Sequence, residues 1–229
     1  MIAPDPAALL PFALLGALLG LDVVSFPQAM ISRPIVAATL GGALGGDVAS
    51  GLMVGAVLEM IALEMLPVGA SRYPEWGTAS VVGGALAATF STLSGAWVVA
   101  VLASIVTAWV GGWSMHALRR LNGSWARRAL PGMEAGAART VLGLQLRGLT
   151  ADLVRGAVLT FVALLVWMPA ASWVVGHWSL GRTASHTVLA GVAAAVAGSA
   201  AWRLSQGVSM ARWYFVGGLA VGVFALVMR

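Results

Sequence analysis

Six charged side chains lie within two proline-containing segments of an otherwise apolar N-terminal region, at residues 21–34 and 59–75. They are Asp22, Arg33, Glu59, Glu64, Arg72 and Glu75. An ionisable group at membrane depth costs at least about 2.5–3.5 kcal/mol on insertion scales, which makes each one a candidate functional group. Residues 21–34 are called the first break below, and residues 59–75 the second break. Together they predict a polar ligand site built within the bilayer.

Glu59 ends a stripe that begins with Gly51 and Gly55, at intervals of four residues. On a helix the three residues share one side, and the glycines are typical of close helix packing. Packing does not account for the carboxylate. Glu59 is therefore either a contact for a ligand or a proton, or an ion-pair partner of Arg33 or Arg72, and the two roles can coexist.

The first break gathers several groups that can hydrogen-bond a ligand: Asp22, Gln28, Ser32 and Arg33. Carboxylate, amide and guanidinium groups offer the forked hydrogen bonding that suits vicinal hydroxyls. The prolines of the break leave backbone groups free to bind as well. The alternative is a polar turn at the membrane surface. In the second break, Glu64 and Arg72 are further candidates, and Tyr73 and the following Trp76 are either interfacial anchors or stacking partners for a sugar.

The composition is that of an integral membrane protein. Of 229 residues, 60% are hydrophobic and 9% are charged, against roughly 25% charged residues in soluble domains. The net charge of +5 is carried without any lysine. In a membrane protein such charge marks the cytoplasmic side, and no nucleic-acid partner is expected. The absence of cysteine excludes disulfides and thiolate chemistry, and we expect no cofactor.

Short apolar segments precede longer ones. Residues 7–20 would form a helix of about 21 Å, which is short of the roughly 30 Å hydrocarbon core. Segments 35–46 and 48–61 are similarly short. Half-span lengths suit helical hairpins that enter and leave on one face, or broken helices that meet at mid-depth. Residues 1–94 are therefore predicted to form two re-entrant helical hairpins with the two breaks at their tips.

Residues 95–229 are predicted to supply about four transmembrane helices, with a basic cytoplasmic loop at 119–155. The spans expected after this loop are 156–176, 187–202 and 213–228. The predicted fold class is an all-α integral membrane protein, in which residues 1–229 form a single membrane-embedded domain.

The arginines predict the orientation in the membrane. If 119–155 is cytoplasmic, the alternation of spans places Arg203 and Arg212 inside as well. Nine of the thirteen arginines are then inside, as the positive-inside rule requires. Both hairpins would be anchored outside, with the two breaks pointing inward.

Residues 32–47 (SRPIVAATLGGALGGD) and 51–70 (GLMVGAVLEMIALEMLPVGA) carry a composite motif. An Arg-Pro pair at a hairpin tip is followed by a Gly-Asp turn and by the stripe that ends at Glu59. In these residues the chain resembles the IIC permease subunit of mannose/fructose/sorbose-type phosphotransferase systems. The resemblance is strong over residues 20–90 and looser toward the C-terminus.

The sequence departs from this pattern after His116, where the family often has an acid and a lysine. This chain has Arg119 and Arg120 instead, so contacts with cytoplasmic partners do not carry over there.

The resemblance implies an all-helical sugar permease of the bacterial inner membrane that crosses it several times and pairs with a IID subunit in a hetero-oligomer. A hexose-type sugar would bind near mid-membrane and be phosphorylated on arrival by a cytoplasmic IIB protein, which receives phosphate through IIA. The chain would not be an enzyme by itself, because the phosphodonor residues are on other chains. Residue-by-residue matching makes Glu59 the best-supported sugar contact, followed by Asp22 and Gln28.

Two other functional classes are open on the sequence. A proton- or cation-coupled secondary transporter or channel would use Glu59 and Asp22 for coupling. An intramembrane enzyme is disfavoured by the lack of a paired nucleophile and base. The three histidines show no metal-ligand spacing, and no metal site is expected.

Overall fold

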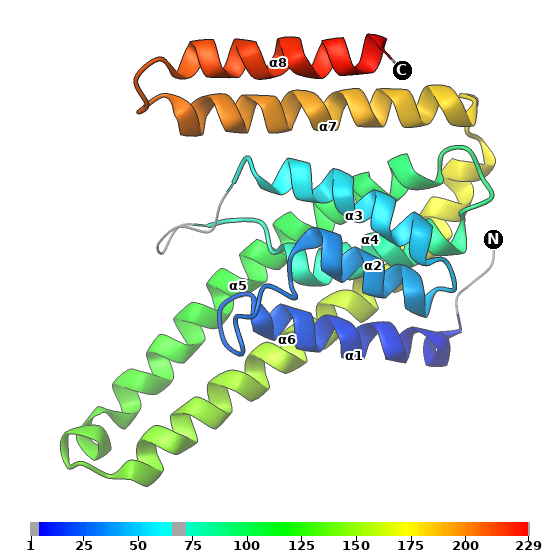
Figure 1. Ribbon diagram of the computed structural model, residues 1–229. Helices are drawn as coiled ribbons and strands as arrows, with labels where there is room; N and C mark the ends of the chain where they lie inside the picture. The colour runs from blue at the N-terminus through cyan, green and yellow to red at the C-terminus, as the bar shows by residue number, and fades with distance from the viewer. Residues whose placement is uncertain (1–4, 66–71, 229) are drawn as a thin grey trace.

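The computed structural model describes residues 5–65 and 72–228 (Figure 1). Over these residues the chain is helical: α1 (Pro6–Asp22), α2 (Pro34–Leu44), α3 (Val48–Ala62), α4 (Trp76–Thr89), α5 (Ala96–Glu134), α6 (Ala138–Gly176), α7 (Arg182–Ser205) and α8 (Ala211–Val227). The all-helical fold predicted from the sequence is confirmed for this part of the chain. Residues 66–71 of the second break lie outside the described residues.

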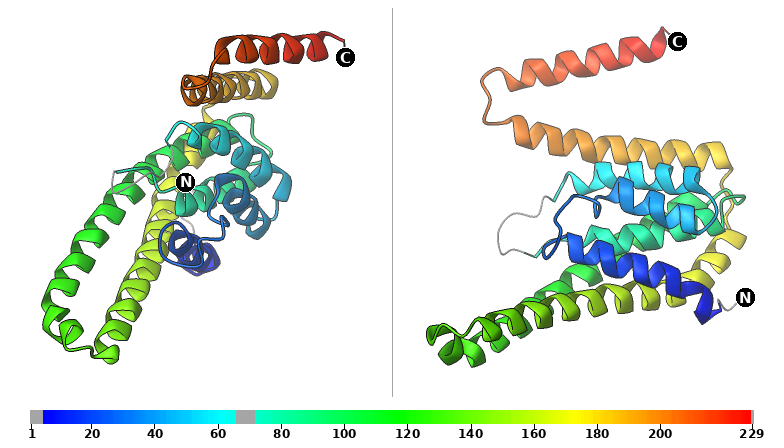
Figure 2. Two further views of the ribbon diagram at one scale, coloured as in Figure 1. Left: turned by 60° about the vertical axis from the view of Figure 1, so that its left-hand side comes forward. Right: turned by 60° about the horizontal axis from the view of Figure 1, so that its bottom comes forward.

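The first four helices are short, with 17, 11, 15 and 14 residues, as the half-span segments predicted. They run back and forth, so the described residues of both breaks lie at one end of the layer (Figures 1 and 2). We call this the break end, and the opposite end, with residues 45–47 and 90–95, the turn end. The helices do not pair simply as two separate hairpins, because α2 packs against α3 and α4 while α1 packs mainly against α6. That they enter and leave a bilayer on one face stays a prediction.

Glycines let α2 and α3 approach to backbone contact. A Cβ atom on Gly51 would lie 2.5 Å from the carbonyl oxygen of Ala38, and one on Gly55 would lie 2.9 Å from the Cα of Ile35. Neither site has room for a side chain, so the glycine stripe has the packing role that its spacing predicted. Behind this pair, α4 is buried from Gly77 to Ala88 and packs against α1, α2, α3, α5 and α6.

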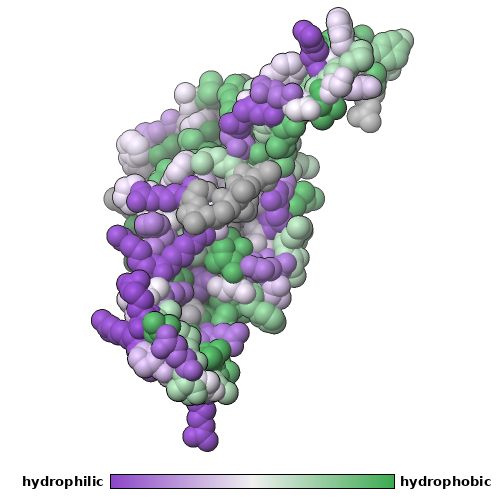
Figure 3. All heavy atoms as spheres, turned by 90° about the vertical axis from the view of Figure 1, so that its left-hand side faces the viewer, coloured by the Kyte–Doolittle hydropathy of each residue, from purple (hydrophilic) through white to green (hydrophobic). Residues whose placement is uncertain are grey.

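The prediction of a loop at 119–155 is wrong, because α5 and α6 continue through it as helices of 39 residues each. At about 1.5 Å per residue, each is about 58 Å long, and their joined ends project from the rest of the molecule (Figure 1). Arginine, alanine and leucine are good helix formers, and the chain reverses only near Gly136, whose φ is +71°. Hydrophilic side chains gather toward this projecting end (Figure 3). The arginine density thus marks a change of surroundings along a helix and not the end of the helix.

The C-terminal helices are loosely attached to the rest. Three helices, α5, α6 and α7, are long and apolar enough to cross a membrane by length and composition, and α8 is apolar but shorter, with 17 residues. Helix α7 packs on α3, α5 and α8, whereas the contacts of α8 are with α7. None of the α8 side chains that the structure describes is buried. The α7–α8 pair therefore presents a large apolar surface.

Candidate functional site

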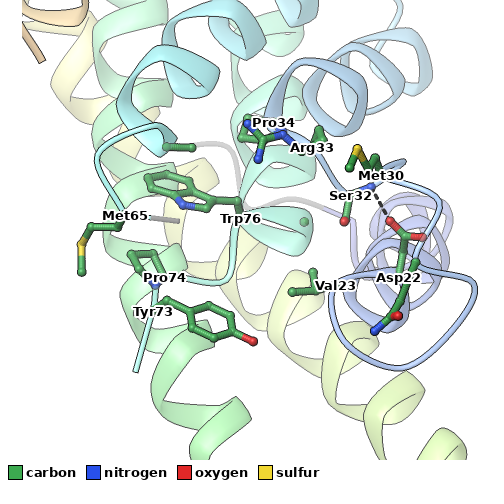
Figure 4. A pocket seen from close by; sticks show the side chains of 13 residues that line it. Asp22, Val23, Met30, Ser32, Arg33, Pro34, Met65, Tyr73, Pro74 and Trp76 are labelled. Atoms are coloured by element: carbon green, nitrogen blue, oxygen red, sulfur yellow. Dashed lines mark hydrogen bonds between the residues drawn. The ribbon is translucent and has the colours of Figure 1, made fainter. Parts of the chain in front are cut away.

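A cavity of about 230 Å³ lies between the two breaks. Its lining residues are Asp22, Val23, Gln28, Met30, Ser32, Arg33 and Pro34 around the first break, and Ala62, Met65, Tyr73, Pro74, Trp76 and Gly77 around the second. In the close view, Asp22 and Ser32 lie on one side of the cavity, and Tyr73 and Trp76 on the other (Figure 4). A polar wall from the first break thus faces an aromatic wall from the second.

The cavity lies where the ends of four short helices meet. The C-terminal ends of α1 and α3 and the N-terminal ends of α2 and α4 all adjoin the breaks. Helix N-termini carry a partial positive charge and free N–H groups, which favour oxygen-rich ligands. Broken helices whose ends point at the substrate are a recurring construction in membrane transporters.

Asp22 shapes the polar wall. Its side chain is buried, with the residue 2% exposed, and it accepts hydrogen bonds from the backbone N–H of Ala29 at 2.6 Å and of Ser32 at 2.9 Å. Between these two donors the chain passes through Met30, which has a φ of 61°, a left-handed conformation uncommon for a residue with a side chain. The carboxylate therefore holds a turn that the backbone does not favour by itself.

Three lining side chains keep hydrogen-bonding capacity. The amide nitrogen of Gln28 donates to the carbonyl oxygen of Val24 at 2.9 Å, which leaves the amide oxygen as an acceptor. The hydroxyl of Tyr73 accepts from Arg119 at 2.6 Å and retains its own proton to donate. The indole Nε1 of Trp76 is buried and has no hydrogen-bond partner within the described part of the chain. The cavity can thus accept from and donate to a polyhydroxyl ligand.

Glu59 forms the ion pair that was one of its two possible roles. Its Oε1 atom accepts from Nε of Arg33 at 2.7 Å and also from the terminal nitrogen of that guanidinium. Its Oε2 atom accepts from the backbone N–H of Ile35 at 3.2 Å, in the first turn of α2. Arg33 lines the cavity, whereas Glu59 is not one of its lining residues. Glu59 therefore orients a cavity residue, and direct contact with a ligand stays a prediction.

Two other predicted site residues point elsewhere. Glu64 pairs with Arg203, which also donates to the Glu64 carbonyl oxygen at 3.1 Å, and so ties the segment that follows α3 to α7. The guanidinium of Arg72 lies 5.7 Å from the ring centre of Trp113 on α5. Among the described residues, the cavity lining includes Asp22, Gln28, Ser32 and Arg33, but not Glu59, Glu64 or Arg72.

Sequence reasoning missed a second group of charges at the break end. Asp152 and Arg155 were counted with a cytoplasmic loop, but they lie on α6, where Asp152 is 0% exposed, and Arg155 contacts Glu75 of the second break. The available signal was an acid and a base three residues apart, directly followed by Gly156 and a long apolar run. One turn of helix separates such residues, so they can pair on a buried face.

The fold and the cavity define a class: a helical membrane protein in which short helices meet end to end at a polar cavity. Residues 8–196 match the family model of the sorbose-specific IIC component of the phosphotransferase system. The chain belongs to this family, as the resemblance read from the motif predicted. Membership does not favour the alternative of a proton- or cation-coupled transporter.

Individual relatives match over shorter stretches. The chain is 41% identical over 54 residues to the sorbose-specific EIIC component of Klebsiella pneumoniae. The aligned stretch covers 24% of this chain and 20% of that protein. It is 42% identical over 50 residues to the mannose-specific EIIC component of Escherichia coli K12. That aligned stretch covers 22% of this chain and 19% of that protein. The chain thus aligns with about a fifth of the length of these relatives.

Solved structures show the same fold over nearly the whole chain. A chain described as a membrane protein superposes with a TM-score of 0.74 at 17% identity, covering 98% of this chain and 94% of that one. A chain of the mannose transporter ManYZ in complex with microcin E492 superposes with a TM-score of 0.61 at 18% identity, covering 99% and 94%. At these identities the likeness concerns the fold.

Proposed function

We propose that this chain is the sugar permease subunit, IIC, of a phosphoenolpyruvate-dependent phosphotransferase system. It binds a hexose-type sugar in the cavity between the two breaks and carries it across the bacterial inner membrane, and a separate IIB protein phosphorylates it. The observation that carries the proposal is the cavity itself, since both breaks of the family motif converge on it.

The size and lining of the cavity support a small polyhydroxyl substrate. Pockets for drug-sized ligands are about 300–1,000 Å³, so a cavity of about 230 Å³ suits a monosaccharide better than a larger solute. Gln28 can accept a hydrogen bond from a sugar hydroxyl, Tyr73 can donate one, and the flat indole of Trp76 can cover the apolar face of a sugar ring. Asp22 and Ser32 complete the polar side.

A IID subunit is the proposed membrane partner. A solved structure with the same fold is that of the mannose transporter ManYZ in a complex with microcin E492. In this chain α8 and one side of α7 present apolar surface that the described residues leave uncovered. The phosphodonor residues belong to the IIB and IIA partners, so the chain alone performs no phosphotransfer. A chain purified without its partner should bind no sugar, and saturable binding by the isolated chain would contradict this part of the proposal.

Uptake measurements test the function. Cells that express this chain with its IID and IIB partners receive a panel of labelled hexoses, including mannose, fructose and sorbose, with and without an energised phosphocarrier. We expect one or more sugars to accumulate as phosphate esters only when the phosphocarrier is energised and this chain is present. Accumulation of unmodified sugar that an ionophore abolishes would instead assign the chain to ion-coupled transport.

Single cysteines test the proposed orientation, because the chain has no cysteine of its own. Ser124→Cys lies on the projecting part of α5, and Ser179→Cys lies between α6 and α7 at the opposite end of α6. An impermeant thiol reagent added to intact cells should label Ser179→Cys, and should label Ser124→Cys only after permeabilisation. The reverse labelling pattern would overturn the proposed orientation, in which the joined ends of α5 and α6 face the cytoplasm.

A further inference from the structure

Beside the cavity, three charged side chains form a buried cluster that joins four parts of the molecule. Arg155 of α6, whose side chain is 9% exposed, donates from Nε to Asp152 at 2.9 Å. Its Nη1 atom lies 3.8 Å from the Oε2 of Glu75 and donates to Ser114 of α5 at 3.2 Å. Asp152 also accepts a hydrogen bond from Ser25 of the first break. One guanidinium group thus stands between the two breaks.

Each break is tied to this cluster by one link. On the side of the first break, the link runs from Arg155 through Asp152 to the hydroxyl of Ser25. On the side of the second break, the link is Glu75, which also starts α4 by accepting from the backbone N–H of Thr78 at 3.1 Å. The residues that line the aromatic wall of the cavity, Tyr73 and Trp76, flank Glu75 in the chain. Arg155 is thus in contact with Glu75 of the second break directly, and with Ser25 of the first break through Asp152.

The surroundings leave the cluster little freedom. A Cβ atom on Gly111 of α5 would lie 2.9 Å from the Cβ of Glu75, and one on Gly77 would lie 2.9 Å from its Oε1. A Cβ on Gly20 of α1 would lie 3.3 Å from Nη2 of Arg155. Glycines of three helices thus let the backbone close around the charges. Removing one member of a buried ion pair leaves the other without compensation, so the position of each charge depends on the others.

We propose that Arg155 is a positioning residue for sugar binding: together with Asp152 and Glu75, it sets the distance between the two breaks that form the cavity. Arg155 does not line the cavity, so it acts through Ser25 and Glu75. This inference rests on the proposed function for its effect on sugar, but the geometric claim stands independently of any substrate.

The geometric claim is tested without sugar. In the cysteine-free chain, spin labels at Ala29→Cys of the first break and Arg72→Cys of the second report the distance between the breaks. The 229-residue chain is reconstituted in lipid nanodiscs for pulsed electron resonance. We expect one narrow distance distribution in the parent and a broadened or displaced one in Arg155→Lys, because an ammonium group cannot reproduce the several directed contacts of a guanidinium. An unchanged distribution in Arg155→Lys overturns the inference, whatever the protein transports.

The functional claim is tested by kinetics in the assembled complex. Arg155→Lys should raise the KM for sugar uptake about tenfold and leave the maximal rate within about twofold. Arg147→Lys, an exposed arginine on the same helix, is the matched control and should change neither value. A variant of Arg155 that lowers only the amount of folded protein, with KM unchanged, identifies a purely structural residue and overturns the proposal.

A milder substitution tests the proposal in case variants of Arg155 fail to fold. Ser25→Ala removes one hydroxyl and retains all three charges, and it should raise KM about threefold. Because Ser25 and Asp152 act through one link, Ser25→Ala combined with Asp152→Asn should raise KM no more than Asp152→Asn alone. Fully multiplicative effects of the two substitutions would show that they act separately and would overturn the proposed link. If the parent complex transports no sugar at all, the proposed function fails, and the distance measurement alone decides the role of Arg155.

Discussion

The two ends of the layer α1–α4 reverse the chain in different ways. At the turn end, α2 connects to α3 through Gly45, Gly46 and Asp47, with Gly46 at a φ of +88° and Asp47 accepting from the backbone N–H of Ser50 at 3.0 Å. A glycine and a helix cap are sufficient there. At the break end, the chain uses longer segments with buried charges, although the geometric task is the same.

The difference indicates what the breaks are for. A reversal that only connects two helices needs a left-handed glycine and a capping side chain. Asp22 and Glu75 do more, because each is buried and each holds one wall of a cavity. Substitutions of the break-end residues that hold the cavity walls should therefore change ligand affinity, and substitutions at the turn end should leave it unchanged.

The largest effect is expected for Asp22→Asn. The amide keeps the shape of the carboxylate. However, it directs an NH2 group at one of the two backbone N–H groups, of Ala29 or Ser32, that now donate hydrogen bonds to Asp22. A buried donor left without an acceptor costs about 1–3 kcal/mol, which is about 5- to 150-fold in sugar affinity if the cost falls on the bound conformation. Titration of the assembled complex with a transported sugar measures it.

The matched control for this substitution is Asp47→Asn at the turn end. Asparagine caps helices about as well as aspartate, and Asp47 is distant from the cavity lining. Its sugar affinity should equal that of the parent. Equal affinities for Asp22→Asn and the parent would remove the distinction between the two ends.

A smaller effect is expected for Glu59→Gln. The substitution weakens the pairing that orients Arg33 against the cavity. A hydrogen bond to a charged group is worth about 1.5–3 kcal/mol, but partial exposure of this pair reduces that to about 1 kcal/mol, or about 5-fold in affinity. Glu64→Gln, at the same end of α3 but paired with Arg203, should bind sugar as the parent does. A larger loss in Glu64→Gln than in Glu59→Gln would show that the site has been built around the wrong carboxylate.

The smallest effect on binding, effectively none, is expected for Gly46→Ala. A side chain in the left-handed region costs about 1–2 kcal/mol, so the variant should unfold at a lower temperature in detergent than the parent. Its sugar affinity should not change. A loss of affinity with unchanged thermal stability would connect the turn end to the site and break the comparison.

Local patterns predicted the short helices, and four of the predicted site residues, all in the first break, line the cavity. Prolines and charges mark the breaks in the sequence, and the spacing of Gly51 and Gly55 predicts a packing face, because each signal depends on a few neighbouring residues. The projecting α5–α6 hairpin was misread as a loop, since composition reports the surroundings of a segment and not its backbone conformation.

The partners of the charges could not be predicted in the same way. The pairing of Glu59 with Arg33 was one of two open choices, and the contact of Arg155 with Glu75 joins residues far apart in the chain. Such contacts depend on how α6 packs against α4, which no local pattern records. For the same reason Glu64 and Arg72 were grouped with the site although they face α7 and Trp113.

The central claim, that sugar binds between the two breaks, is tested most directly by protection of a single cysteine. The chain has no cysteine, so Ser32→Cys, which lines the cavity, and Ser179→Cys, in the connection between α6 and α7, each provide one thiol. Maleimide labelling rates are measured in the assembled complex with increasing concentrations of a transported sugar. A saturable slowing at Ser32→Cys with no change at Ser179→Cys is the predicted result. Labelling of Ser32→Cys that stays constant at saturating sugar would contradict the claim.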